Sequence, residues 1–179
     1  MTVTDLAPSP VAEAAAALAD EQWRVAGLLA AASSRFEEAA RLRREDRWWL
    51  ARRGHFPLNS AELDWTPREI AGHLRDSAAV FTERLTRLRT EDEPQFADFA
   101  PAEPARLAGY AATPFEQLVA ELRTAQADLL RAVADVDPGD LDRAGVHEVD
   151  GRVTVGDVLR FLPAHQRDHA EQLTALLHH

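Results

Sequence analysis

Three histidines have the type and spacing of a metal site. His165 and His169 stand four residues apart in a segment whose apolar residues recur with helical spacing, so both rings leave one helix face. His73 lies on the apolar stripe of a second predicted helix, where an unused imidazole is costly to bury. Three imidazoles that leave coordination positions open are typical of a catalytic rather than a structural metal ion.

Missing residue types limit the chemistry that the chain itself can supply. The 179 residues include no cysteine, which excludes disulfides, a thiol nucleophile and thiolate ligands from the protein. All 20 basic residues are arginine, so lysine Schiff bases and lysine general bases are excluded as well. A chain without cysteine is typical of the cytoplasm, and thiol chemistry would need a thiol from outside the protein.

Charge and length narrow the choice of partners. The net charge is -10, which repels nucleic acid and anionic lipid. We therefore expect that the protein binds neither nucleic acid nor a membrane and that its partner is a small-molecule substrate. The start of the chain shows no pattern that predicts a signal peptide or a membrane span, and residues 1–10 are expected to be flexible. The length and the 46% hydrophobic content predict a single globular domain over residues 1–179.

Helix signals recur along the chain. Residues 10–53 are helical in composition, with a break expected near Ser33-Ser34 or at residues 44–46. A second helix should begin at Pro67, because Thr66 can cap it and Glu69 can complete a capping box. The segment Thr113-Pro114 repeats this signal and predicts a helix to about residue 136.

The last helix should start near Thr154 and run to about Leu176, interrupted and bent at Pro163. Residues 54–65 and 90–109 are predicted to be irregular connections, and Asp150-Gly151 predicts a small hairpin within residues 146–153. Four helical segments with little strand predict an all-α fold, an antiparallel four-helix bundle that builds its site from inward-facing side chains.

Three segments carry a family resemblance: WTPREIAGHLRD (residues 65–76), DGRVTVGDVL (150–159) and HQRDHAEQL (165–173). In this order they resemble the DinB/YfiT-like superfamily, over roughly residues 18–177. The resemblance implies a four-helix bundle with a divalent metal ion, usually nickel or zinc, held by one histidine of the second helix and an HxxxH pair of the last. By position these are His73, His165 and His169.

The resemblance leaves the reaction open. Relatives include thiol-dependent S-transferases, a mycothiol-dependent maleylpyruvate isomerase and proteins described as metal-dependent hydrolases. The leading hypothesis is therefore a transferase in which a low-molecular-weight thiol, activated by the metal, attacks an electrophile. A hydrolase using metal-bound hydroxide ranks second, because the sequence identifies no proton acceptor for it. A non-catalytic metal- or ligand-binding bundle is the third, and a homodimer through the first helix is expected from the relatives.

Several other side chains are weaker candidates. Asp76, Asp168 and Glu69 lie within one helical turn of a candidate ligand and could orient an imidazole, but a surface or capping role is the better interpretation. No catalytic residue is assigned. The terminal pair His178 and His179 is placed outside the site.

The aromatic candidates and one further histidine are interpreted structurally. Trp65 and the pair Trp48-Trp49 are expected to be core or helix-start aromatics rather than substrate walls. Tyr110 is a weak site candidate, and His147 is expected to be a solvated loop histidine unless the hairpin folds over the site.

Overall fold

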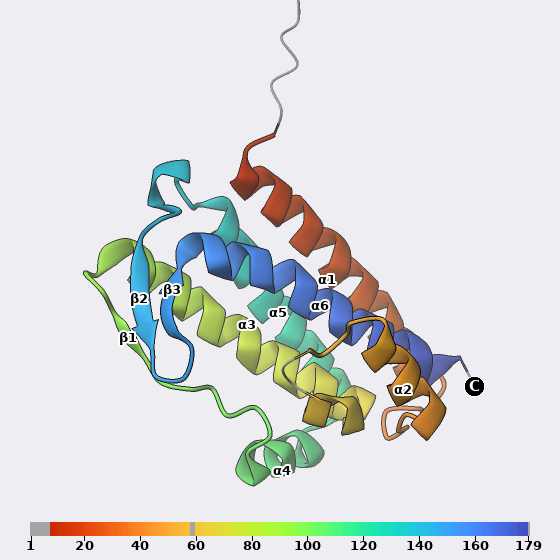
Figure 1. Ribbon diagram of the computed structural model, residues 1–179. Coiled ribbons are helices and arrows are strands. Elements are labelled where there is room, and N and C mark those ends of the chain that lie inside the picture. The colour runs from red at the N-terminus through yellow and green to blue at the C-terminus, as the bar shows by residue number, and fades with distance from the viewer. Residues whose placement is uncertain (1–7, 58–59, 179) are drawn as a thin grey trace, which may run out of the picture.

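Helices make up most of the computed structural model, which describes residues 8–57 and 60–178. In order, the elements are α1 Pro10–Ser34, α2 Arg44–Arg52, the 3-10 turn η1 Ser60–Asp64, α3 Pro67–Thr90, β1 Gln95–Phe96, α4 Pro104–Ala112, α5 Phe115–Ala134, the 3-10 turn η2 Pro138–Asp140, β2 Ala144–His147, β3 Gly151–Thr154 and α6 Val155–Leu177 (Figure 1). The all-α bundle with a small hairpin before the last helix is confirmed. The expected flexible start lies largely outside the described residues, as does His179.

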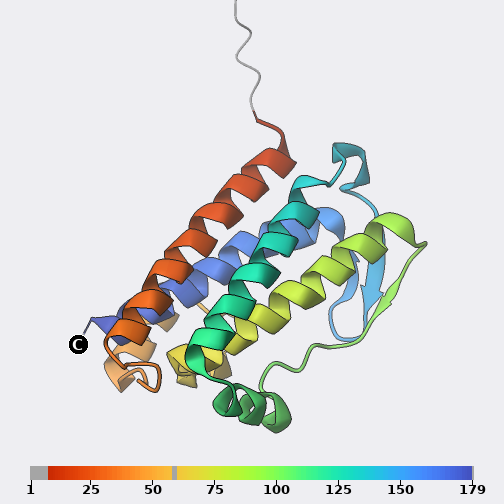
Figure 2. The same cartoon turned by 180° about the vertical axis from the view of Figure 1, so that it is seen from behind.

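Four long helices form the bundle, and their directions are paired. Both α1 and α3 pack against α5 and α6, so α1 and α3 lie across a diagonal. Arg35, after the end of α1, donates to the carbonyl oxygen of Leu177 at 3.0 Å, so α1 and α6 end together. Arg68, in the first turn of α3, donates to the carbonyl oxygen of Thr113, beside the start of α5. Thus α1 and α6 run one way and α3 and α5 the other (Figures 1 and 2).

This pairing forces residues 91–114 to return along the length of the bundle. On the way, β1 pairs in parallel with β2, and β2 pairs antiparallel with β3. The resulting three-stranded sheet lies beside the end of α3 and the start of α6 (Figure 1). The sheet therefore covers one end of the α3/α6 pair, which is the pair that carries the three histidines.

Helix starts agree with the sequence signals at two of three places. The amide of Thr66 donates to Glu69 Oε2 at 2.8 Å and the amide of Glu69 donates to Thr66 Oγ1 at 3.2 Å, which is a complete capping box. Thr154 and Asp157 form another at the start of α6. That helix continues through Pro163, so the proline removes one amide donor without ending the helix.

Two expectations about the connections were incomplete or wrong. The predicted irregular connection 90–109 contains most of α4, and Thr113 ends α4 by donating its hydroxyl to the carbonyl oxygen of Gly109 instead of capping α5. The break after Ser34 is confirmed, but residues 35–43 are not helical and the chain resumes as the separate helix α2.

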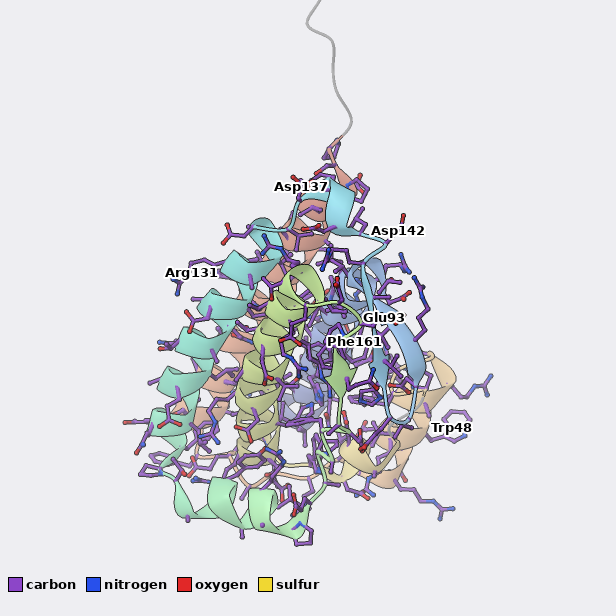
Figure 3. All side chains as sticks on the ribbon, turned by 90° about the vertical axis from the view of Figure 1, so that its left-hand side faces the viewer. Trp48, Glu93, Arg131, Asp137, Asp142 and Phe161 are labelled. Atoms are coloured by element: carbon purple, nitrogen blue, oxygen red, sulfur yellow. The ribbon has the colours of Figure 1, made fainter. Side chains whose placement is uncertain are left out.

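Trp48 and Trp49 were wrongly expected in the core. They are 61% and 44% exposed on α2, where Leu50 is the buried residue. Trp48 projects outward from the bundle (Figure 3). The guanidinium groups of Arg52 and Arg53 lie over the two rings, so cations cover the indoles in place of core side chains.

The apolar core is divided in two by a polar layer. One apolar cluster occupies each end of the bundle. Between them, Gln22 of α1 donates to the carbonyl oxygen of Gln126, and Gln126 donates to Gln166 Oε1, both at 3.2 Å. These buried side chains share their level with the histidines of α3 and α6, so the candidate site lies at mid-height in the bundle. No helix among the described residues is long and apolar enough to cross a membrane.

Gly72→Ala should destabilise the fold, because a Cβ at this position would lie 2.3 Å from Cδ1 of the buried Tyr110 ring. We expect the free energy of unfolding to fall by about 1–3 kcal/mol, measured by chemical denaturation. The control is Gly27→Ala on the exposed face of α1, where nothing lies within 4 Å and the helix should gain about 0.5–1 kcal/mol. Equal stability of Gly72→Ala and the wild type would mean that Tyr110 does not pack closely on α3.

Candidate metal site

Four buried side chains converge at the middle of the bundle. They are Glu62 of η1, His73 of α3, and His165 and His169 of α6, and their ligand atoms all lie within 4.8 Å of one another. Nε2 of His73 is 2.9 Å from Nε2 of His165, and Oε2 of Glu62 is 3.2 Å from Nε2 of His169. The structure therefore brings the three predicted histidines together and adds a carboxylate that the sequence analysis missed.

Glu62 reaches the site because η1 leads directly into α3. The carbonyl oxygen of Glu62 accepts from the amide of Trp65, which precedes the capping residue of α3. No periodic pattern or motif marks Glu62, since it belongs to a short turn in a connection that was expected to be irregular. Its position just ahead of the helix that carries His73 is the one sequence clue that could have drawn attention to it.

Gln172 fixes the orientation of two members of the cluster. Its Nε2 donates to the carbonyl oxygen of Glu62 at 2.7 Å, so its Oε1 faces Nδ1 of His169, 3.0 Å away. Because an amide oxygen only accepts, Nδ1 of His169 carries a proton and Nε2 is the ring nitrogen that faces the cluster. A buried amide on α6 thus holds both the ring of His169 and the turn that bears Glu62.

Asp168 fastens the segment that precedes η1. Its carboxylate oxygens lie 2.8 Å from Nδ1 of His55 and 3.0 Å from the amide nitrogen of Phe56. Phe56 has a φ of 55°, a left-handed conformation that costs energy for a bulky residue, and its ring packs edge-on against His169 with centroids 5.1 Å apart. Asp168 therefore shapes the wall of the site instead of orienting a candidate ligand.

The imidazoles of His73 and His165 are electrically neutral at ordinary pH. Burial lowers the pKa of His73 well below its usual 6.5, and the neighbouring His169, His165 and Arg106 lower it further. Burial and His169 do the same to the pKa of His165. Neutral rings offer nitrogen lone pairs, which is the form that binds a metal ion.

Unsatisfied polar atoms indicate what the cluster could hold. Among the described residues, Oε2 of Glu62, Nδ1 of His73 and Nε2 of His169 are buried without a hydrogen-bond partner, although Oε2 and Nε2 lie near each other. Such atoms are rare in folded proteins because each costs desolvation energy. Imidazoles and carboxylates are common ligands for a divalent metal ion such as zinc. The residues present therefore fit a divalent metal ion.

Aromatic rings enclose the cluster. The ring centroid of Trp65 lies 4.7 Å from that of His73, and the ring of Phe161 stacks on His165 at 5.0 Å. The ring centroid of Phe99 lies 5.7 Å from that of His73. The buried Trp65 lowers the local dielectric on its side of the site, which strengthens electrostatic interactions there, whereas Phe161 is 40% exposed. Trp65 is buried, as predicted, but it also forms part of this wall.

The other candidates lie outside the cluster. Asp76 accepts from Arg75, Arg106 and the hydroxyl of Tyr110, so it and Tyr110 fasten α4 to α3. Glu69 is the capping carboxylate that the sequence favoured. His178 follows the end of α6, away from the cluster, in a groove lined by Trp48 and Trp49.

The expectation for His147 was wrong. Expected as a solvated loop histidine, it is 5% exposed on β2, because the hairpin folds it toward α3. There its Nε2 lies 3.3 Å from Nη2 of Arg84. The buried ring faces a guanidinium at the sheet end of the bundle and is not a member of the metal cluster.

Metal titration of the full chain should saturate at about one divalent ion per chain, and His169→Ala should abolish high-affinity binding. Gln172→Ala should weaken the affinity roughly 10–100-fold, because the ring of His169 loses its orienting acceptor. Gln22→Ala is the matched control, since it removes a buried glutamine that does not touch the cluster. If Gln172→Ala and Gln22→Ala bind metal equally well, the positioning role of Gln172 is wrong.

The metal-free protein should lose stability as the pH falls below about 6.5. The unfolded chain binds protons at His73 and His165 there, whereas burial keeps the folded rings neutral, so the free energy of unfolding drops by about 1.4 kcal/mol per pH unit for each ring. Chemical denaturation after chelation, at several pH values, measures this slope. His165→Gln should show a shallower slope, and an unchanged slope would contradict the assignment.

Comparison with known proteins agrees with this architecture. Residues 4–173 match the family model of the DinB superfamily. A protein of Oceanobacillus iheyensis, named "putative metal-dependent hydrolase", is 30% identical over 129 residues, which cover 66% of this chain and 73% of that protein. No solved structure gives a significant match. With a family match that covers nearly its whole length, the chain belongs to the DinB superfamily.

Proposed function

We propose that the protein is a metal-dependent hydrolase that uses Glu62 as its proton acceptor. The observation that carries the proposal is the buried Oε2 of Glu62, which lies beside three imidazoles and has no hydrogen-bond partner among the described residues. The name of the Oceanobacillus relative points the same way. The sequence had placed hydrolysis second because no proton acceptor was identifiable, and Glu62 supplies one.

In this proposal His73, His165 and His169 would hold the metal. A divalent ion held by such ligands would lower the pKa of water and polarise a carbonyl oxygen. Glu62 takes the proton from the attacking water at Oε2 and returns it to the leaving group, while Gln172 keeps the turn of Glu62 in place. Glu62 is buried, so its carboxylate acts in a low-dielectric site.

A thiol-dependent transferase is the second candidate. The same carboxylate could take the proton of an incoming thiol, and the aromatic wall suits a thiolate, which is less strongly hydrated than hydroxide. Because the chain has no cysteine, the thiol would be an external low-molecular-weight compound. A bundle that only holds a metal or a ligand is the third candidate, and it differs from both enzymes in lacking metal-dependent turnover.

The remaining proposals concern the metal, the cellular location, the substrate class and the oligomeric state. Nickel and zinc are proposed as the metal, since imidazole nitrogen suits both ions. The lack of cysteine supports a cytoplasmic location, and the net charge of -10 supports a small-molecule substrate over nucleic acid or anionic lipid. A homodimer through α1 is proposed from the exposed Trp23 on that helix, which is 83% accessible.

Glu62→Gln should lower the kcat for hydrolysis of an activated ester, such as p-nitrophenyl acetate, by about 10²–10⁴-fold while the bound metal is retained. Turnover with and without added thiols, together with metal content, is the measurement. Glu69→Gln is the control, because glutamine also completes a capping box and this carboxylate lies outside the site.

The outcomes separate the candidates. Loss of metal from Glu62→Gln would make Glu62 a ligand and not a proton acceptor. Turnover only with a thiol present, with the thiol incorporated in the product, would favour the transferase. The absence of metal-dependent turnover with every ester and thiol would leave the non-catalytic bundle.

A further inference from the structure

A largely apolar pocket lies at the sheet end of the bundle. It has a volume of about 190 Å³ and opens between α3, α6 and the three strands. In Figure 3, which views the molecule from its sheet side, Phe161 marks the place where these elements meet. Six of the ten lining residues are apolar, namely Phe81, Leu88, Phe96, Val153, Val158 and Phe161. Leu88, Phe96 and Val158 belong to the apolar core cluster at this end, so the floor of the pocket is the core itself.

The polar groups of the lining already have partners within the protein. Nη2 of Arg84 donates to the carbonyl oxygen of Ala97 at 2.7 Å and to Nε2 of His147 at 3.3 Å. Nδ1 of His147 in turn lies 3.1 Å from a carboxylate oxygen of Asp150. The carboxylate of Asp157 completes the capping box of α6. With these partners in place, the pocket offers a ligand chiefly apolar contact, which favours an uncharged group over an ion.

One aromatic side chain connects this pocket with the metal cluster. The ring of Phe161 lines the pocket and stacks on His165, with centroids 5.0 Å apart and planes 16° apart. Its other aromatic neighbour is Phe81, at 5.2 Å between centroids. His165 follows Phe161 by one helical turn, about 6 Å along the axis of α6. His165 is 8% exposed, against 2% for His73 and 0% for His169, so the cluster is most accessible at the ring beside Phe161.

The size of the pocket limits the group that fits. A cavity of roughly 150 Å³ accepts benzene, so a pocket of about 190 Å³ holds a group of about six carbon atoms. We propose that this pocket binds the acyl chain of the substrate, with the chain passing Phe161 and the ester carbonyl lying beside the histidine cluster. This assignment rests on the proposed function and names its substrate class, which is an ester whose acyl group is uncharged and apolar.

Turnover of p-nitrophenyl esters from acetate to decanoate tests the acyl assignment. We expect kcat/KM to rise about fourfold for each added methylene up to roughly the hexanoate, and then to level off or fall, because a buried methylene contributes about that factor. Val153→Phe narrows the pocket from β3, so it should lower kcat/KM for the hexanoate at least about tenfold and leave that for the acetate unchanged. Phe81→Ala widens the pocket from α3, so the preferred chain should become longer.

Val146→Phe is the matched control for the narrowed pocket. Val146 pairs with Arg152, and Val153 pairs with Gly145, across β2 and β3. Because successive residues of a strand point to opposite faces, the two valines lie on opposite faces of the sheet. Val146 is not among the residues that line the pocket. The same bulky side chain at this position should therefore leave the chain-length preference of the wild type unchanged.

Binding of 1-hexanol to the full chain after chelation tests the pocket without turnover. Hexanol should cause saturable chemical-shift changes at the methyl groups of Leu88 and Val158 in a ¹³C spectrum, since both side chains line the pocket. Val153→Phe should abolish these changes, and Val146→Phe should preserve them.

The outcomes separate the pocket from the proposed function. Absence of saturable hexanol binding, or equal binding to both valine variants, would overturn the assignment of the pocket. Turnover that depends on Glu62 but proceeds equally with every chain length would keep the proposed function and reject the acyl subsite. Hexanol binding that follows Val153, in a protein without metal-dependent ester turnover, would keep the apolar pocket and reject the proposed function.

Discussion

The fold depends on keeping polar side chains satisfied at the level where a bundle is normally driest. Burying an imidazole or a carboxylate without a partner costs several kcal/mol, so the apolar clusters at the two ends must offset the layer between them. In the glutamine part of this layer, Gln22, Gln126 and Gln166 form hydrogen bonds with one another. Where His73, His169 and Glu62 meet, polar atoms remain without partners among the described residues. The unpartnered atoms of this cluster carry an energetic cost that a bound metal ion would offset.

The direction of the helices explains why the site has a turn on one side and a sheet on the other. Because α3 and α5 run the same way, the chain must return along the bundle, and it supplies β1 on that return. The hairpin then joins β1 and delivers the chain to the start of α6. At the opposite end, η1 enters α3 and presents Glu62. The connections of this bundle therefore carry chemistry, while the helices supply the rigid frame that fixes the histidines.

Periodicity and capping signals predicted the long helices because these features are local. The start of α3 follows from Thr66 and Glu69, and the common face of His165 and His169 follows from helix geometry alone. The convergence of His73 with them could be expected only through the family resemblance. Glu62 and His147 could not be found in this way, since each reaches its site through a nonlocal contact of a turn or a hairpin. The prediction that Trp48 is buried was wrong for the same reason. The burial of this side chain depends on what covers α2, which no local sequence pattern indicates.

The charge that a metal ion would bring to the cluster differs from that of the molecule around it. Imidazole ligands add no charge to a divalent ion, so an ion held by the three histidines would keep its double charge beside the carboxylate of Glu62. The pocket between α3, α6 and the sheet holds carboxylates as well as a cation, because Asp150 and Asp157 line it together with Arg84. A net positive charge would therefore be confined to the cluster, inside a molecule of net charge -10. Because the side chains of the cluster are buried, the dielectric around that charge is low, and the charge would act strongly on a polarised group that reaches it.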